Sequence, residues 1–103
     1  MKLSGTFVVR NIAGDTIAVP VGETAIKVNG MITLTEVGAF IWQQLGKETT
    51  VEELVKSITD EYQVEEPTAR EDLMEFLQNL KKADLLQLAH EEAKAIDQAA
   101  TEQ

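Results

Sequence analysis

The chain has 103 residues, a formal net charge of −9 and no cysteine, so one domain is expected, and disulfides, zinc–thiolate sites and thiol catalysis are excluded. It contains no run of about 18 apolar residues, and its first residues, MKLSGTFVVR, lack a signal-peptide core, so a cytoplasmic location without membrane contact is expected. Residues 1–34 hold three cations and two carboxylates, a net +1, which leaves −10 for the remainder and disfavours nucleic acid and anionic lipid as partners.

Two strands are predicted near the N-terminus, at about residues 6–13 and 16–21. The segment TFVVRNIAGDTIAVPVG contains two apolar, β-branched runs separated by AGD, which is a turn signal. Pro20 cannot donate a hydrogen bond to a ladder, so the second strand should end there or lie at an edge.

A third strand is predicted at 31–34. The pair Asn29-Gly30 indicates a turn, but a plain hairpin around it would place the most apolar residues of its two arms on opposite faces. We therefore expect an irregular approach over 24–28. The strand MITLT should then pair back on Thr16–Val19, with Ile32 and Leu34 on the core side.

Three helices follow, at about residues 36–46, 50–62 and 67–83. Thr35 is a good N-cap, Thr50 and Glu53 form a capping box, and Pro67 suits a first helical turn. Apolar residues recur at helical spacing and define the expected inner faces: Val37, Phe40, Ile41 and Leu45; Val51, Leu54, Val55, Ile58 and Tyr62; Ala69, Leu73, Phe76, Leu77 and Leu80. Trp42 lies off the first of these faces and is expected to be half-buried core.

The end of the third helix is expected at Asp84. Aspartate tolerates left-handed backbone geometry better than most residues, so a break or kink is predicted there. The tail at 87–103 is rich in Ala, Glu and Gln, and it is expected to be weakly helical or disordered.

These elements predict an α+β fold, a three-stranded antiparallel sheet followed by three helices, in a winged helix-turn-helix-like topology. Catalytic chemistry is missing: the one histidine, His90, lies in the tail, and no nucleophile, phosphate-binding or dinucleotide motif occurs. The acidic pairs fit solvated helix surfaces better than a metal cage. A binding module without catalytic site, cofactor or metal is therefore predicted.

Two kinds of binding module fit this topology. A winged helix-turn-helix protein usually reads DNA through its last helix, but three cations and three carboxylates in residues 67–83 cancel, which is a poor match to phosphates. An exposed strand edge at MITLT could instead accept an extended peptide, with the neighbouring helix supplying side-chain pockets. A structural dimer that uses the tail is a third possibility.

Three stretches resemble the PqqD family, named for the pyrroloquinoline quinone synthesis protein D. They are NGMITLTEVGAFIWQQL, TTVEELVKSITDEYQV and TAREDLMEFLQNLKKADLL, and the whole match spans roughly residues 5–86. The sequence departs from the family where Thr35 replaces a frequent Asn and Asp84 a common Gly. The resemblance implies a peptide-binding domain at 1–86 that recognises the leader of a ribosomally made precursor peptide and presents it to a modifying enzyme, often a radical S-adenosylmethionine maturase.

The resemblance also implies where the leader binds: as an added strand beside the third strand and against the third helix. On this sequence the strand is Met31, Ile32, Thr33, Leu34 and Thr35. On the helix, Arg70, Met74, Leu77 and Lys81 form a stripe beside the inner face and are the predicted peptide contacts, although the helical wheel leaves open which flank faces the groove. The two cations would favour an acidic leader. A homodimer is a further possible assembly.

Overall fold

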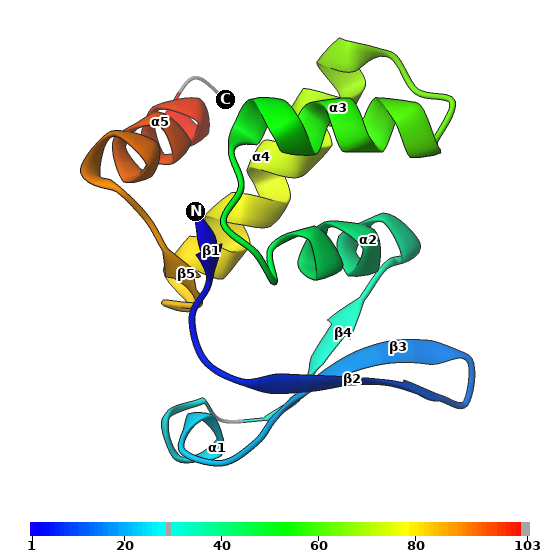
Figure 1. The fold of residues 1–103 in the computed structure, drawn as a ribbon, viewed down its shortest axis with the longest axis vertical. Helices are drawn as coiled ribbons and strands as arrows, with labels where there is room; N and C mark the ends of the chain where they lie inside the picture. Colours follow the sequence, from blue (N-terminus) through cyan, green and yellow to red (C-terminus); the bar gives the residue numbers. More distant parts are fainter. Residues whose placement is uncertain (29, 102–103) are drawn as a thin grey trace.

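The computed structural model describes residues 1–28 and 30–101, and it separates a helical half from a small sheet (Figure 1). Its elements are β1 (Lys2–Leu3), β2 (Phe7–Ile12), β3 (Asp15–Pro20), α1 (Thr24–Lys27), β4 (Ile32–Leu34), α2 (Glu36–Gln44), α3 (Val51–Glu61), α4 (Glu66–Lys82), β5 (Leu86–Gln87) and α5 (His90–Thr101). The predicted α+β class is confirmed. In the described part of the chain, no helix is both long and apolar enough to cross a membrane.

The three-stranded sheet has the order β2-β3-β4 and is antiparallel throughout. A two-residue turn joins β2 to β3, and both of its residues, Ala13 (φ 53°) and Gly14 (φ 90°), have the positive φ that such tight turns need. The expected pairing of the third strand on the second is confirmed, since Ile32 lies opposite Ala18 and Leu34 opposite Thr16. The turn predicted at Asn29-Gly30 includes Asn29, which lies outside the described residues.

The core forms where the sheet meets the helices. Leu34 is buried, and Ile32 packs against the same cluster, so the predicted inner face of β4 is confirmed. The other buried apolar residues come mainly from the helices: Ile41, Trp42, Leu45, Leu54, Val55, Ile58, Ala69, Leu73, Leu77 and Leu80. Trp42 is more buried than predicted, because Phe7 of β2 covers it edge-on with ring centroids 5.1 Å apart. This contact holds the β2–β3 hairpin against α2.

The predicted helix starts are confirmed. The hydroxyl of Thr35 accepts a hydrogen bond from the Gly38 N–H (3.0 Å), and that of Thr50 accepts one from the Glu53 N–H (3.2 Å). The Thr35 cap matters most for the site described below, because it makes β4 pass into α2 without a loop.

The break predicted at Asp84 is confirmed. Asp84 has φ 60°, its N–H donates to the Lys81 carbonyl (3.0 Å), and the Leu85 N–H donates to the Leu80 carbonyl (2.9 Å). These two bonds form a Schellman motif, which satisfies the last carbonyls of α4 and turns the chain away.

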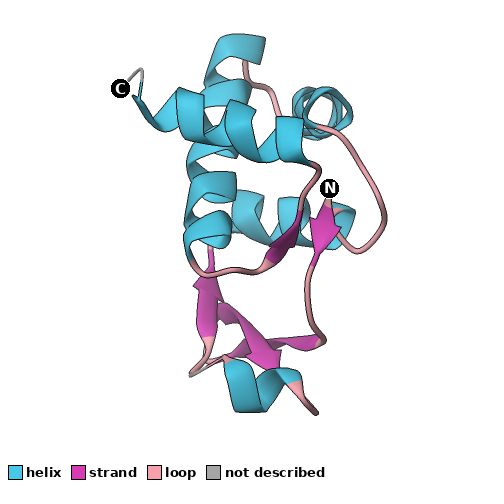
Figure 2. Cartoon of the chain, turned by 90° about the vertical axis from the view of Figure 1, so that its left-hand side faces the viewer, coloured by secondary structure: helices cyan, strands magenta, loops and turns pink. Residues whose placement is uncertain are grey.

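Three elements were not predicted from the sequence. The four-residue helix α1 replaces the irregular approach expected over 24–28. The strands β1 and β5 pair with each other, and Figure 2 shows this small pair between the helices and the three-stranded sheet. Each of these strands has only two residues, and they lie far apart in the sequence, so no local pattern reveals them.

Helix α5 packs on α4, and its first turn forms an ion pair with the N-terminal amine. Ile96 is 1% exposed, and its carbonyl accepts a hydrogen bond from the Gln78 side chain of α4. The Met1 α-amino group donates to Glu48 Oε1 (2.7 Å), the Thr49 carbonyl (2.7 Å) and Glu92 Oε2 (3.0 Å). The ammonium thus joins the α2–α3 loop to α5.

This cluster predicts a pH window for stability. Burial alone would lower the pKa of the Met1 amine, but its hydrogen bonds to Glu48 and Glu92 outweigh burial and raise it above 8.0. Burial likewise opposes ionisation of Glu92, yet the Ala89 N–H and the ammonium hold the pKa of this carboxyl below 4.5. The contribution of Glu92 is therefore lost as pH falls through its folded pKa, and that of the amine as pH rises through its own.

We expect the melting temperature to be highest between about pH 4.5 and 8 and to fall on both sides. Thermal unfolding followed by circular dichroism across this range measures it. The Glu92→Gln variant should be less stable at neutral pH and should show a weaker fall on the acid side. An acid limb identical to that of the wild type would show that Glu92 does not contribute.

Candidate functional site

The strand β4 lies at the edge of the three-stranded sheet, with β3 on one side. No other described strand pairs with β4, so its second side is free to accept a strand. Thr33 is exposed, as are Met31 (64%) and Thr35 on either side of the strand.

Alternation along the ladder shows which backbone groups point to the free side. The Val21 N–H donates a hydrogen bond to the Thr6 carbonyl (3.0 Å). These two residues lie opposite each other, one position beyond the pair Phe7 and Pro20 of the β2–β3 ladder. Hydrogen-bonded pairs alternate in an antiparallel ladder, so the odd-numbered residues of β3 bond to β2 and the even-numbered ones face β4. Pro20, which lacks an N–H, is even-numbered, so β2–β3 pairing loses no hydrogen bond there.

The same alternation orients β4. Ala18 and Thr16 face β4, so their partners Ile32 and Leu34 direct their backbone groups toward β3. Thr33 lies between them, and its N–H and C=O therefore point toward the free edge. Sequence alone did not decide between these two orientations.

A hollow of about 360 Å³ begins where β4 ends and lies between α2 and α4; we call it the α2–α4 hollow. Its lining is apolar at the floor and polar at the rim: Thr35, Val37, Gly38, Ile41, Asp72, Glu75, Phe76 and Asn79. Gly38 allows the two helices to approach closely. A Cβ at this position would lie 3.2 Å from the Phe76 ring and 3.0 Å from the Thr35 hydroxyl oxygen.

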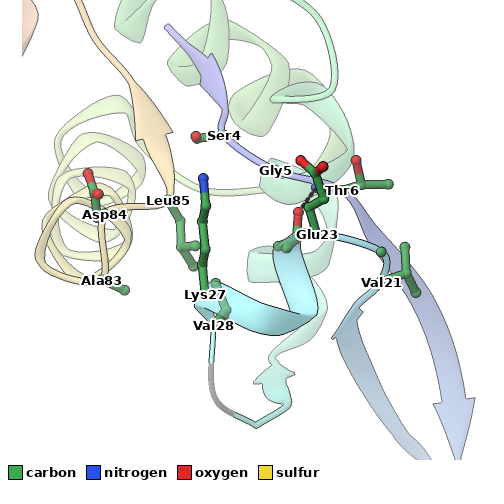
Figure 3. A pocket seen from close by; sticks show the side chains of 12 residues that line it. Ser4, Gly5, Thr6, Val21, Glu23, Lys27, Val28, Ala83, Asp84 and Leu85 are labelled. Carbon is green, nitrogen blue, oxygen red and sulfur yellow. Dashed lines mark hydrogen bonds between the residues drawn. The ribbon is translucent and has the colours of Figure 1, made fainter.

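A second hollow, of about 580 Å³, lies at the other end of β4, between α1 and the end of α4; we call it the α1 hollow. Figure 3 shows the Lys27 side chain rising from α1, with Glu23 just before this short helix and Asp84 just after α4. Val28, just before β4, also lines it. The α2–α4 hollow thus begins where β4 ends, and the α1 hollow is lined by the segment that leads toward β4 and by the residues that follow α4.

The structure places the predicted strand residues 31–35 at this edge but turns the predicted helix residues away from it. Residues two apart on a helix differ by about 200° in direction, so Phe76 in the α2–α4 hollow and Met74 face opposite flanks of α4. Met74 is half-buried on the flank that also carries Arg70 and Lys81.

The contacts of these residues agree with this placement. Arg70 pairs with Glu52 of α3 (2.7 Å) and Glu66 (3.0 Å), and these hydrogen bonds raise the pKa of its guanidinium and lower that of the Glu52 carboxyl. Lys81 pairs with Asp97 of α5 (2.9 Å). Leu77 is 0% exposed and belongs to the core.

The flank of α4 that lines the α2–α4 hollow is Asp72, Phe76 and Asn79, with Glu75 beside them. Sequence reasoning did not select these residues, because both flanks border the same apolar face at equivalent helical spacing. One flank is instead contacted by α3 at Arg70 and by α5 at Lys81, and the position of α5 has no local signal in the sequence. Among the described residues, no three histidine or carboxylate side chains gather in a way that could hold a metal ion.

Comparisons with known proteins bear on this region. The family model of coenzyme PQQ synthesis protein D (PqqD) matches residues 22–86, which run from before α1 through α4 to β5. A solved structure described as "TbiB1 in Complex with the TbiA(beta) Leader Peptide" is similar, with 30% sequence identity and a TM-score of 0.65. The similarity covers 86% of this chain and 99% of that chain. No curated protein matches the chain.

Proposed function

Because the chain belongs to the PqqD family, we propose that it is a binding module that takes the leader segment of a ribosomally synthesised precursor peptide as an added strand beside β4. The observation that carries the proposal is the free edge at Thr33, whose N–H and C=O are unused by β3. The similar solved structure, TbiB1, is a complex with a leader peptide, which supports this class of ligand.

The proposed contacts are of two kinds. Backbone groups at Met31–Thr35 would hold the leader in extended form, and this gives affinity without strong sequence preference. Side chains of the leader would enter the α2–α4 hollow, where Phe76, Val37 and Ile41 offer apolar surface. Arg70, Leu77 and Lys81 would act indirectly, by fixing α4 against α3, the core and α5.

We propose further that the chain presents the bound leader to a separate modifying enzyme. The resemblance to the family suggests that this enzyme is a radical S-adenosylmethionine maturase. A leader held along one strand edge leaves the following segment of the precursor free for such an enzyme. The net charge of −9 argues against the DNA-binding alternative, because phosphate contacts need clustered cations. A homodimer would compete for the same exposed edge.

Truncation of one side chain on each flank of α4 tests the site. Short peptides selected from a random displayed library on the wild-type chain serve as the probe, and titration calorimetry measures their affinity. Phe76→Ala should weaken binding by about 1–2 kcal/mol, roughly fivefold to thirtyfold, because it removes an aromatic wall of the hollow.

Met74→Ala is the matched control, since Met74 is also half-buried but lies on the opposite flank of the same helix. It should leave the affinity unchanged. The reverse pattern, with loss only in Met74→Ala, would return the site to the flank predicted from the sequence. Thermal unfolding of both variants checks that they remain folded.

A further inference from the structure

We infer that this chain selects a basic leader, with a lysine or arginine side chain held by Asp72 and Glu75 at the rim of the α2–α4 hollow. The inference rests on the proposed function and specifies the chemical class of its ligand. It reverses the charge preference that the sequence predicted, because the structure assigns the expected cations to other contacts.

The hollow itself carries only negative charge. Asp72 and Glu75 are its two titratable side chains, and the other residues in its lining are neutral. Both carboxylates are exposed, and neither has an ion-pair partner among the described residues. They are therefore available to a cation on a ligand that occupies the hollow.

The nearby cations do not offset these carboxylates. Arg70 and Lys81 lie on the opposite flank in ion pairs with Glu52, Glu66 and Asp97. Lys82 comes seven residues after Glu75, which is about 10 Å along the helix axis and about one Debye length at physiological salt.

The α1 hollow does not reverse the negative net charge of the surface near β4. It contains Lys27, but Glu23 and Asp84 line it too, so its own titratable side chains sum to −1. With the −2 of the α2–α4 hollow, the surfaces at the two ends of β4 carry −3 in total. An acidic leader would meet repulsion at both ends of the strand, and a basic one attraction.

The hollow also suits the shape of a long cation. The alkyl stem of a lysine or arginine can lie along the Phe76 ring while its charged end reaches a carboxylate at the rim. A short apolar side chain would fill the same floor without using Asp72 or Glu75. Charge at the rim therefore adds selectivity to a site whose floor is apolar.

The test is a parallel selection of short random peptides on three folded proteins. These are the wild type, the groove variant Asp72→Asn with Glu75→Gln, and a control, Glu61→Gln with Glu91→Gln. Both doubles remove two exposed carboxylates and so change the net charge equally. Wild type and control should enrich lysine and arginine, and the groove variant should lose this enrichment.

A basic peptide selected on the wild type should then bind the groove variant about threefold to tenfold more weakly, and added salt should reduce that difference. Peptides that bind at β4 without charge preference, or with acidic residues, would overturn the inference and leave the proposed function intact. Equal loss in the control would overturn it too, by showing that only net charge matters. Selected peptides whose binding is unaffected by Thr33→Pro would instead contradict the proposed function.

Discussion

Replacement of Thr33 by proline should weaken peptide binding by about 1–3 kcal/mol, roughly fivefold to 150-fold, while the fold survives. The substitution removes the N–H that points to the free edge and leaves a carbonyl of the added strand without its donor. The pairing of β4 with β3 uses Ile32 and Leu34, so the sheet itself loses no hydrogen bond. Calorimetric titration with a library-selected peptide, together with thermal unfolding, measures both effects.

Ile32→Pro is the matched control one residue away. The Ile32 N–H faces β3, so proline there removes a hydrogen bond of the ladder and brings its ring against the neighbouring strand. This variant should lose stability, and any loss of binding should follow from that. If instead Thr33→Pro unfolds and Ile32→Pro only loses binding, the orientation of β4 derived above is reversed.

Leu77→Ala should lower the free energy of unfolding by about 2–5 kcal/mol. Leu77 is 0% exposed, and truncation of a fully buried leucine removes apolar contacts and leaves a cavity. Urea unfolding followed by Trp42 fluorescence measures it, because Trp42 is the one tryptophan and is itself buried.

This variant also separates two roles for Leu77. As a core residue it should leave peptide affinity nearly unchanged under conditions where the variant stays folded. A stability loss below about 1 kcal/mol together with a large loss of affinity would place Leu77 in the ligand surface, as the sequence predicted.

Local patterns in the sequence predicted much of the fold correctly. The caps at Thr35 and Thr50 and the break at Asp84 follow from the chemistry of single side chains and nearby backbone groups. The pairing of β4 on β3 was predicted because only that arrangement turns Ile32 and Leu34 to the core together. These features depend on residues close in sequence or on one face of one element.

Features that depend on distant contacts were not predicted. The β1–β5 pair joins two segments that are far apart in the sequence, and α1 is too short to show a period. The choice of flank on α4 depends on α5, which packs on one side through Ile96 and Asp97. Because α3 contacts this flank at Arg70 and α5 covers it at Lys81, the open flank is the one with Phe76, although both satisfy the same helical spacing.

Amide hydrogen exchange at Thr33, followed by nuclear magnetic resonance with and without a library-selected peptide, tests strand addition at β4 most directly. In the free protein the Thr33 amide should exchange fast, because it has no partner in the sheet, while the amides of Ile32 and Leu34 are protected by β3. On binding, the Thr33 amide should become strongly protected and the other two should change little. Saturating peptide that leaves Thr33 exchange unchanged, with new protection elsewhere, would contradict the account.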